Sequence, residues 1–129
     1  MNLSKIEEEA NIMQAELECC IPTDGNGAVE HATRLAVYMA RSGQLLAEAK
    51  KLMRDKKTAE ISNTIIAIAK ESCLSAKVQN ALIDSIASDE MYIVDWLDRI
   101  NRTCTHDIDL CRTIVSKEKL ELQYLNYQV

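Results

Sequence analysis

The chain has 129 residues, which is enough for a single domain of ordinary size. It contains three Gly, one Pro and no Phe, and only 4% of its residues are aromatic, so most sheet folds are excluded and a few long helices are favoured. The net charge of −5 argues against a dedicated duplex-DNA binder, whose domain is usually basic.

The charge is distributed unevenly along the chain. Residues 1–30 carry one Lys against seven acidic residues, a net charge of −6. Residues 31–60 carry seven Lys or Arg against three acidic residues, or +4, and the remaining residues have a net charge of −3. The sequence therefore predicts an acidic start followed by a basic helix.

The five cysteines form an odd set, and the first twenty residues resemble neither a secretory leader nor a transit peptide. No apolar run approaches the roughly 18 residues that a membrane span needs. We therefore expect a cytoplasmic protein of a bacterial host cell, with no membrane partner and with reduced thiols that pack as small hydrophobic side chains.

The first predicted element is an acidic helix over residues 1–21. Ser4 and Glu7 have the spacing of a capping box, and a narrow apolar stripe follows. Pro22 should end this helix, and the only Pro and two of the three Gly place a loop at residues 22–27.

A long basic helix is predicted over residues 28–71. Apolar residues recur on one face and Lys or Arg lie toward its flanks. No Gly or Pro after Gly43 forces a break, so the sequence leaves open whether this is one helix or two, with Thr58 as a candidate break point.

Two further helices complete the prediction. Ser75 is a candidate N-cap for a short helix over residues 75–87, and Ser88, Asp89 and Glu90 mark the start of a long helix over residues 88–127. We predict an all-α fold in one domain, residues 1–129. In it two long helices pack antiparallel, with an N-terminal helix and a short connecting helix, and few aromatic residues favour a helical-bundle homo-oligomer.

Catalytic and metal chemistry have little support in the sequence. Cys104, His106 and Cys111 cannot converge on one metal ion from a single helix. The stretch Gly25-Asn26-Gly27 lacks the spacing and the Lys of a phosphate-binding loop. We therefore expect no enzyme activity, no catalytic residue, no metal site and no cofactor.

The basic helix is the first candidate site. Positive charges along a backbone, together with an occasional aromatic side chain, are what sequence-independent binding of single-stranded nucleic acid requires. Two alternatives remain: the acidic first helix could cover these charges, or another anionic ligand could bind them. The candidate residues for binding nucleic acid or another anion are Arg34, Tyr38, Arg41, Lys50, Lys51, Arg54 and Lys57.

The last helix carries an alternative site for a nucleotide or other ligand. Its polar residues share faces at helical spacing, which is also the pattern of a solvated stripe with salt pairs inside the helix. Tyr92 and Trp96 could stack on a base or could anchor the core. The residues of this alternative ligand ridge are Tyr92, Arg99, Arg102, His106 and Arg112.

The layout of residues 30–120 resembles UvsY-type recombination mediators of tailed phages. The likeness lies in residues 34–38 with 49–51, a connector, and then residues 89–97 and 110–114. The resemblance implies a small all-helical oligomer that binds single-stranded DNA and helps to load a recombinase. It also implies that Arg41, Lys50, Lys51 and Arg54 are basic residues of the DNA-binding helix.

We therefore predict a non-enzymatic, oligomeric helical protein of phage or mobile-element type. It would bind single-stranded DNA and partner proteins, such as a recombinase, in recombination or repair. One alternative is a phage-encoded inhibitor or sponge that binds a host defence protein or its nucleotide messenger. A second alternative is a structural adaptor that only mediates oligomerisation.

Overall fold

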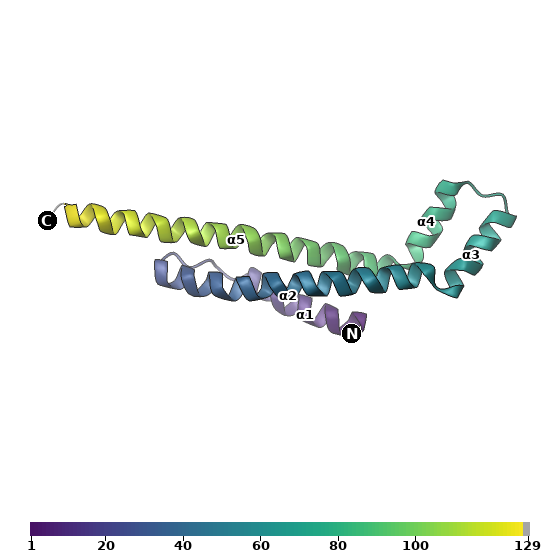
Figure 1. Cartoon of the computed structure of the whole chain (residues 1–129), viewed down its shortest axis with the longest axis horizontal. Helices are drawn as coiled ribbons and strands as arrows, with labels where there is room; N and C mark the ends of the chain where they lie inside the picture. The colour runs from purple at the N-terminus through teal and green to yellow at the C-terminus, as the bar shows by residue number, and fades with distance from the viewer. Residues whose placement is uncertain (128–129) are drawn as a thin grey trace.

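A computed structural model describes residues 1–127, with the side chains of residues 60–62 left out. Over this range the chain is all-helical and contains no strand (Figure 1). Its helices are α1 (Leu3–Leu17), α2 (Gly25–Thr58), α3 (Glu60–Glu71), α4 (Ala76–Ile86) and α5 (Ser88–Tyr127). The all-α fold class predicted from composition is thus confirmed.

The two long helices, α2 and α5, lie side by side (Figure 1). The Gly25 N–H donates to the carboxylate of Glu118 at one end of the pair. Lys56 and Glu90 form an ion pair at the other end. The Gly25–Glu118 and Lys56–Glu90 contacts therefore mark opposite ends of the pair.

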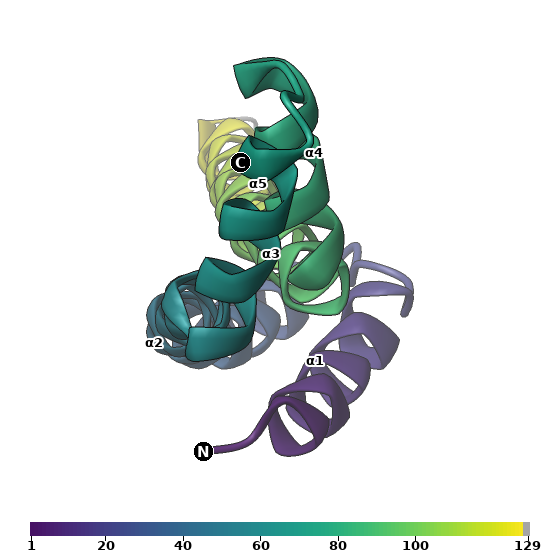
Figure 2. The ribbon, with the colours of Figure 1, turned by 90° about the vertical axis from the view of Figure 1, so that its right-hand side faces the viewer.

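The remaining helices pack against this pair or project from it. Viewed along the long axis in Figure 2, α1 lies against α2 and α5, whereas α3 and α4 project from one end as a hairpin. The core lies where α1, α2 and α5 meet, because each of these helices buries an apolar stripe there. Its largest fully buried apolar side chains include Ile6, Leu35, Leu45, Leu97 and Ile100.

A polar contact inside this packed region sets α2 and α5 in register. The Asn101 Nδ2 of α5 donates to the main-chain oxygen of Met39 at 2.8 Å and to Ser42 Oγ at 3.0 Å. Ser42 is fully buried and donates to the same Met39 oxygen at 3.0 Å. Sliding either helix would take the Asn101 amide away from both of its partners on α2, so the contact favours one alignment.

The prediction of a first helix over residues 1–21 is wrong at its end. The helix stops at Leu17, with Glu18 as its C-cap. A proline ring clashes with the carbonyl group four residues earlier, which for Pro22 is that of Glu18. The N-cap is Asn2, whose side chain accepts a hydrogen bond from the Lys5 N–H, rather than the Ser4 expected from the capping box.

The predicted loop at residues 22–27 is also displaced. The connection comprises residues 18–24, and Gly25, Asn26 and Gly27 form the first turn of α2. Asp24 caps this helix, because its carboxylate accepts a hydrogen bond from the Gly27 N–H at 2.9 Å. With the N–H groups of Gly25 and Gly27 both paired, a Gly-containing sequence can begin a helix.

The segment 28–71 forms two helices, which answers the question left open by the sequence. Ala59 takes an extended conformation between α2 and α3. The Thr58 hydroxyl donates to the main-chain oxygen of Arg54, a local bond that competes with continued helix. Two short helices, α3 and α4, therefore connect α2 to α5 where one was expected.

The predictions for α4 and α5 are confirmed. Ser75 caps α4, since its hydroxyl accepts a hydrogen bond from the Val78 N–H. The helix α5 begins at Ser88 and extends to Tyr127. No helix in residues 1–127 has both the length and the apolarity needed to cross a membrane.

Candidate nucleic-acid interface

Two arginines of the predicted basic site are covered by the acidic helix α1. Arg41 binds the carboxylate of Glu9 in a two-pronged contact, with its Nη2 at 2.7 Å from Oε2 and 2.8 Å from Oε1. The Arg34 Nε lies 2.9 Å from Oε1 of Glu16. This is the arrangement expected if the acidic first helix covers part of the basic one.

Lys57, a third member of the predicted site, lies at the far end of α2. Its Nζ is 3.1 Å from Oδ1 of Asp84 in α4. Next to it, the Lys56 Nζ is 3.1 Å from Oε1 of the buried Glu90 in α5. Lys57 thus connects α2 to α4, and Lys56 connects it to α5.

Tyr38 does not serve as an open stacking surface. It is half-buried and packs against the core, together with Met39 and Trp96. Trp96 in turn donates a hydrogen bond from Nε1 to Gln14 Oε1 of α1 at 3.0 Å. These aromatic side chains therefore help to hold α1 against the long helices.

The remaining three residues, Lys50, Lys51 and Arg54, form what we call the basic triad. All three are exposed, and none of their side chains forms an ion pair within the described chain. At about 100° per residue they point away from Leu45 and Ala49, the buried face of α2. The triad is thus a compact positive surface available to a phosphate backbone.

The alternative ligand ridge on α5 is only partly assembled. Arg99, Arg102 and His106 line one shallow pocket of about 440 Å³, but Asp95 and Asp98 line it as well. The Arg102 Nε lies 3.1 Å from Oδ2 of Asp98. These carboxylates reduce the positive charge that a nucleotide phosphate would meet.

The other two ridge residues lie apart from that pocket. Arg112 pairs with Asp109 at 3.6 Å and lines a different groove, between α2 and α5. Tyr92 is 65% exposed, and its ring lies 6.1 Å from that of Trp96, measured between centroids. The structure therefore does not bring all five ridge residues into one site.

Two of the cysteines, Cys104 and Cys111, are buried, so their thiols are shielded from reagents in solution. Burial, together with the smaller effect of the nearby Asp107 carboxylate, raises the pKa of the Cys104 thiol to about 11. The same two causes raise the pKa of Cys111. Cys19, Cys20 and Cys73 are exposed and unbridged. No cluster of three or more potential ligands that could hold a metal ion occurs in the described part of the chain.

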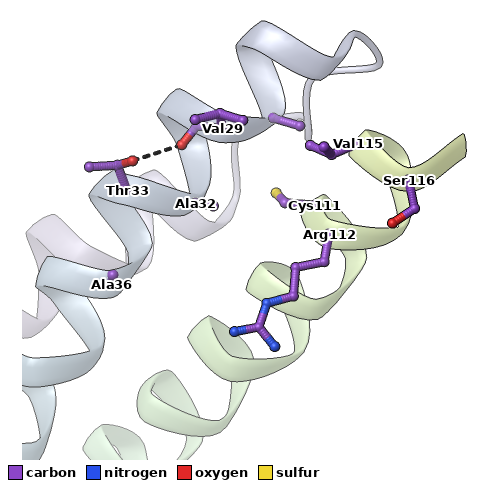
Figure 3. A pocket seen from close by; sticks show the side chains of 9 residues that line it. Val29, Ala32, Thr33, Ala36, Cys111, Arg112, Val115 and Ser116 are labelled. Atoms are coloured by element: carbon purple, nitrogen blue, oxygen red, sulfur yellow. Dashed lines mark hydrogen bonds between the residues drawn. The ribbon is translucent and has the colours of Figure 1, made fainter. Parts of the chain in front are cut away.

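A groove between α2 and α5 escaped the sequence reasoning. Ala32 and Ala36 line it from α2, and Cys111 and Val115 line it from α5 (Figure 3). It has a volume of about 640 Å³. The spacing of Ala32 and Ala36 at i and i+4 was the available signal, because two small residues on one helix face leave room beside a neighbouring helix.

A second missed residue is Glu118, which interrupts the apolar spacing of α5. Its carboxylate accepts a hydrogen bond from the Gly25 N–H at the start of α2, where the helix dipole favours negative charge. An acidic residue within an apolar seam was the signal, although its partner could not be read from the spacing.

Comparisons with known proteins give no family assignment. No protein-family model matches the chain, and no curated protein or solved structure matches it significantly.

Proposed function

We propose that this chain is a non-enzymatic, self-associating protein that binds single-stranded DNA through the basic triad. In this proposal α2 and α5 form an antiparallel pair that is the subunit of a homo-oligomer. The observation that carries the proposal is the exposure of Lys50, Lys51 and Arg54 without ion pairs, next to cations of the same helix that are paired.

The chemistry of the triad supports contact with a phosphate backbone. Three positive charges within about one and a half turns of helix span roughly 6 Å, close to the distance between neighbouring phosphates of a strand. Tyr38, the aromatic residue of α2, is half-buried, so base stacking would contribute little. Binding should therefore depend on salt and hardly on base sequence.

Assembly strengthens such a weak site. One triad offers only three phosphate contacts, but linked copies bind one strand at several points, and each further contact becomes effectively intramolecular. This is the mode of action that the resemblance to UvsY-type mediators implies. A role in recombination or repair, with a recombinase as partner, belongs to the same proposal.

Fluorescence anisotropy with a labelled oligonucleotide of mixed sequence tests the proposal. The triple variant Lys50→Gln/Lys51→Gln/Arg54→Gln should lose most of the affinity at about 50 mM salt. The matched control is Lys5→Gln/Lys77→Gln/Lys117→Gln, which removes three exposed positive charges elsewhere. Equal losses in both variants would show that only net charge matters and would reject the triad as the site.

A structural adaptor is the second candidate function. It is favoured by the large exposed apolar side chains near the C-terminal end of α5 and on α4, such as Tyr124, Leu125, Val78 and Leu82. An adaptor would associate with itself or with proteins but would give no anisotropy change with DNA. The anisotropy experiment therefore separates the two functions.

A further inference from the structure

The helix α5 reaches beyond the start of α2. Glu118 lies beside Gly25, the first residue of α2, so residues 119–127 extend past that end (Figure 1). We call residues 119–127 the overhang. At 1.5 Å per residue it is about 13 Å long.

The overhang is apolar on more than one side. Its apolar residues are 56% to 91% exposed, the highest value belonging to Tyr127. A contiguous exposed apolar surface on a helix is normally covered by a partner. The residues concerned are Leu120, Leu122, Tyr124, Leu125 and Tyr127.

Part of this surface continues the packing seam inside the chain. Cys104 and Cys111 are buried in α5, and Leu122 and Leu125 follow them at helical spacing on the same side. The first two face α2, whereas the last two lie beyond its end. The apolar face of α5 thus continues at Leu122 and Leu125, past the end of its partner helix α2.

The groove between α2 and α5 lies next to the overhang. Its α2 wall covers residues 28–36, which is about 13 Å of helix and equals the length of the overhang. A smaller hollow lined by Val29, Val115 and Leu122 joins the two. Apart from Arg112, small side chains line the groove (Figure 3). Large side chains cover the overhang, so the two surfaces complement each other in size.

We propose that a second copy of this chain occupies the groove, with the overhang of each copy lying in the groove of the other. The two α5 helices would then cross in opposite directions around a two-fold axis near residue 118. Such an interface is isologous, so one arrangement covers both apolar surfaces on both copies and closes as a dimer.

The area supports a stable contact. The overhang exposes five large side chains, worth on the order of 500 Å² of apolar surface. If half of it were buried against an equal area of groove, the two symmetric contacts would together remove about 1,000 Å² from water, the lower bound for a specific interface. The inference rests on the self-association in the proposed function and is independent of DNA binding.

Light scattering coupled to size-exclusion chromatography of the full chain at tens of micromolar tests the interface. The wild type should have twice the 14.5 kDa mass of one chain. Two variants should elute at the mass of one chain. One is Leu122→Glu/Leu125→Glu in the overhang, and the other is Ala36→Glu in the groove. The control Ile12→Glu/Val37→Glu places charges on exposed apolar positions outside the interface and should remain a dimer.

The outcomes separate the two claims. A monomeric wild type would overturn both the interface and the self-association, and would leave DNA binding by the triad to be judged on its own. An assembly that persists in the overhang and groove variants would overturn the interface alone. All variants alter exposed side chains, so circular dichroism should show the same helix content as the wild type.

Discussion

Replacing Asn101 should destabilise the chain through the polar contact that aligns α2 with α5. In Asn101→Leu the hydrogen bonds to the Met39 oxygen, at 2.8 Å, and to Ser42 Oγ, at 3.0 Å, are lost. Ser42 still donates to the Met39 oxygen, so that acceptor keeps one partner. Two hydrogen bonds at about 1 kcal/mol each, less the gain from burying an apolar side chain, predict a loss of about 1–2 kcal/mol.

The variant Asn101→Asp sharpens this prediction. Its carboxylate would face the Met39 oxygen without a proton to donate, so the pKa of the new acid should rise above its unfolded value of about 3.9. Stability conferred by the neutral form is then present below that value and lost as pH rises through the folded pKa. Relative to wild type, the variant should be least stable near neutral pH and should recover near pH 4.

Urea unfolding followed by circular dichroism at pH 7 and pH 4 measures both effects. Thr113→Val is a suitable control, because Thr113 lies farther along the same helix, is exposed, and donates its hydroxyl within α5 to the main-chain oxygen of Asp109. If Asn101→Leu and Asn101→Asp both unfolded like wild type at pH 7, Asn101 would not align the helices. An Asn101→Asp deficit that is independent of pH would refute the proposed orientation of its side-chain amide.

Three other predictions concern α1 and the buried thiols. The variant Glu9→Gln/Glu16→Gln frees two arginines of α2, so its affinity for single-stranded DNA should rise. The slope of log K against log salt, measured by anisotropy, should steepen by up to about 1.4. An unchanged slope would show that α1 still shields the two arginines. Cys104 and Cys111 should resist labelling by a maleimide in the native protein, whereas the three exposed cysteines should react. Mass spectrometry can count the labels on each chain. Five labels without denaturant would contradict the packing of α5. Since the folded pKa of Cys104 is about 11, the free energy of unfolding should also fall as pH rises from about 9 to 11. A Cys104→Ala variant should show a smaller decline, because the pKa of Cys111 is raised as well.

Helix type and order could be predicted from the sequence because local signals agree with the final structure. Ser75 caps α4 as its position suggests, and Ser88 begins α5. The start of α2 depends on a distant partner as well as on its local cap, Asp24. Gly25 can start a helix because Glu118, 93 residues away, accepts a hydrogen bond from its N–H. No local pattern around Gly25 contains that information.

The candidate site likewise combines features that the local sequence predicts with features that only tertiary packing decides. Composition alone indicated a basic segment and an acidic start, but which cations remain free is decided by how α1 lies on α2. Arg41 is paired because Glu9, 32 residues earlier in the sequence, lies beside it. Lys50 and Arg54 lie on the exposed face of α2, past the N-terminal end of α1. Helical spacing predicts which residues share a face of one helix, but the partner of that face depends on tertiary packing.

The salt dependence of binding to single-stranded DNA tests the central claim most directly. With anisotropy measured from about 50 to 200 mM salt, three phosphate contacts predict a slope of log K against log salt of about −2 per chain. The triple variant of Lys50, Lys51 and Arg54 should reduce this slope to near zero, while the Lys5, Lys77 and Lys117 control keeps it. A wild-type slope near zero, or one that the triad variant leaves intact, would contradict the proposal.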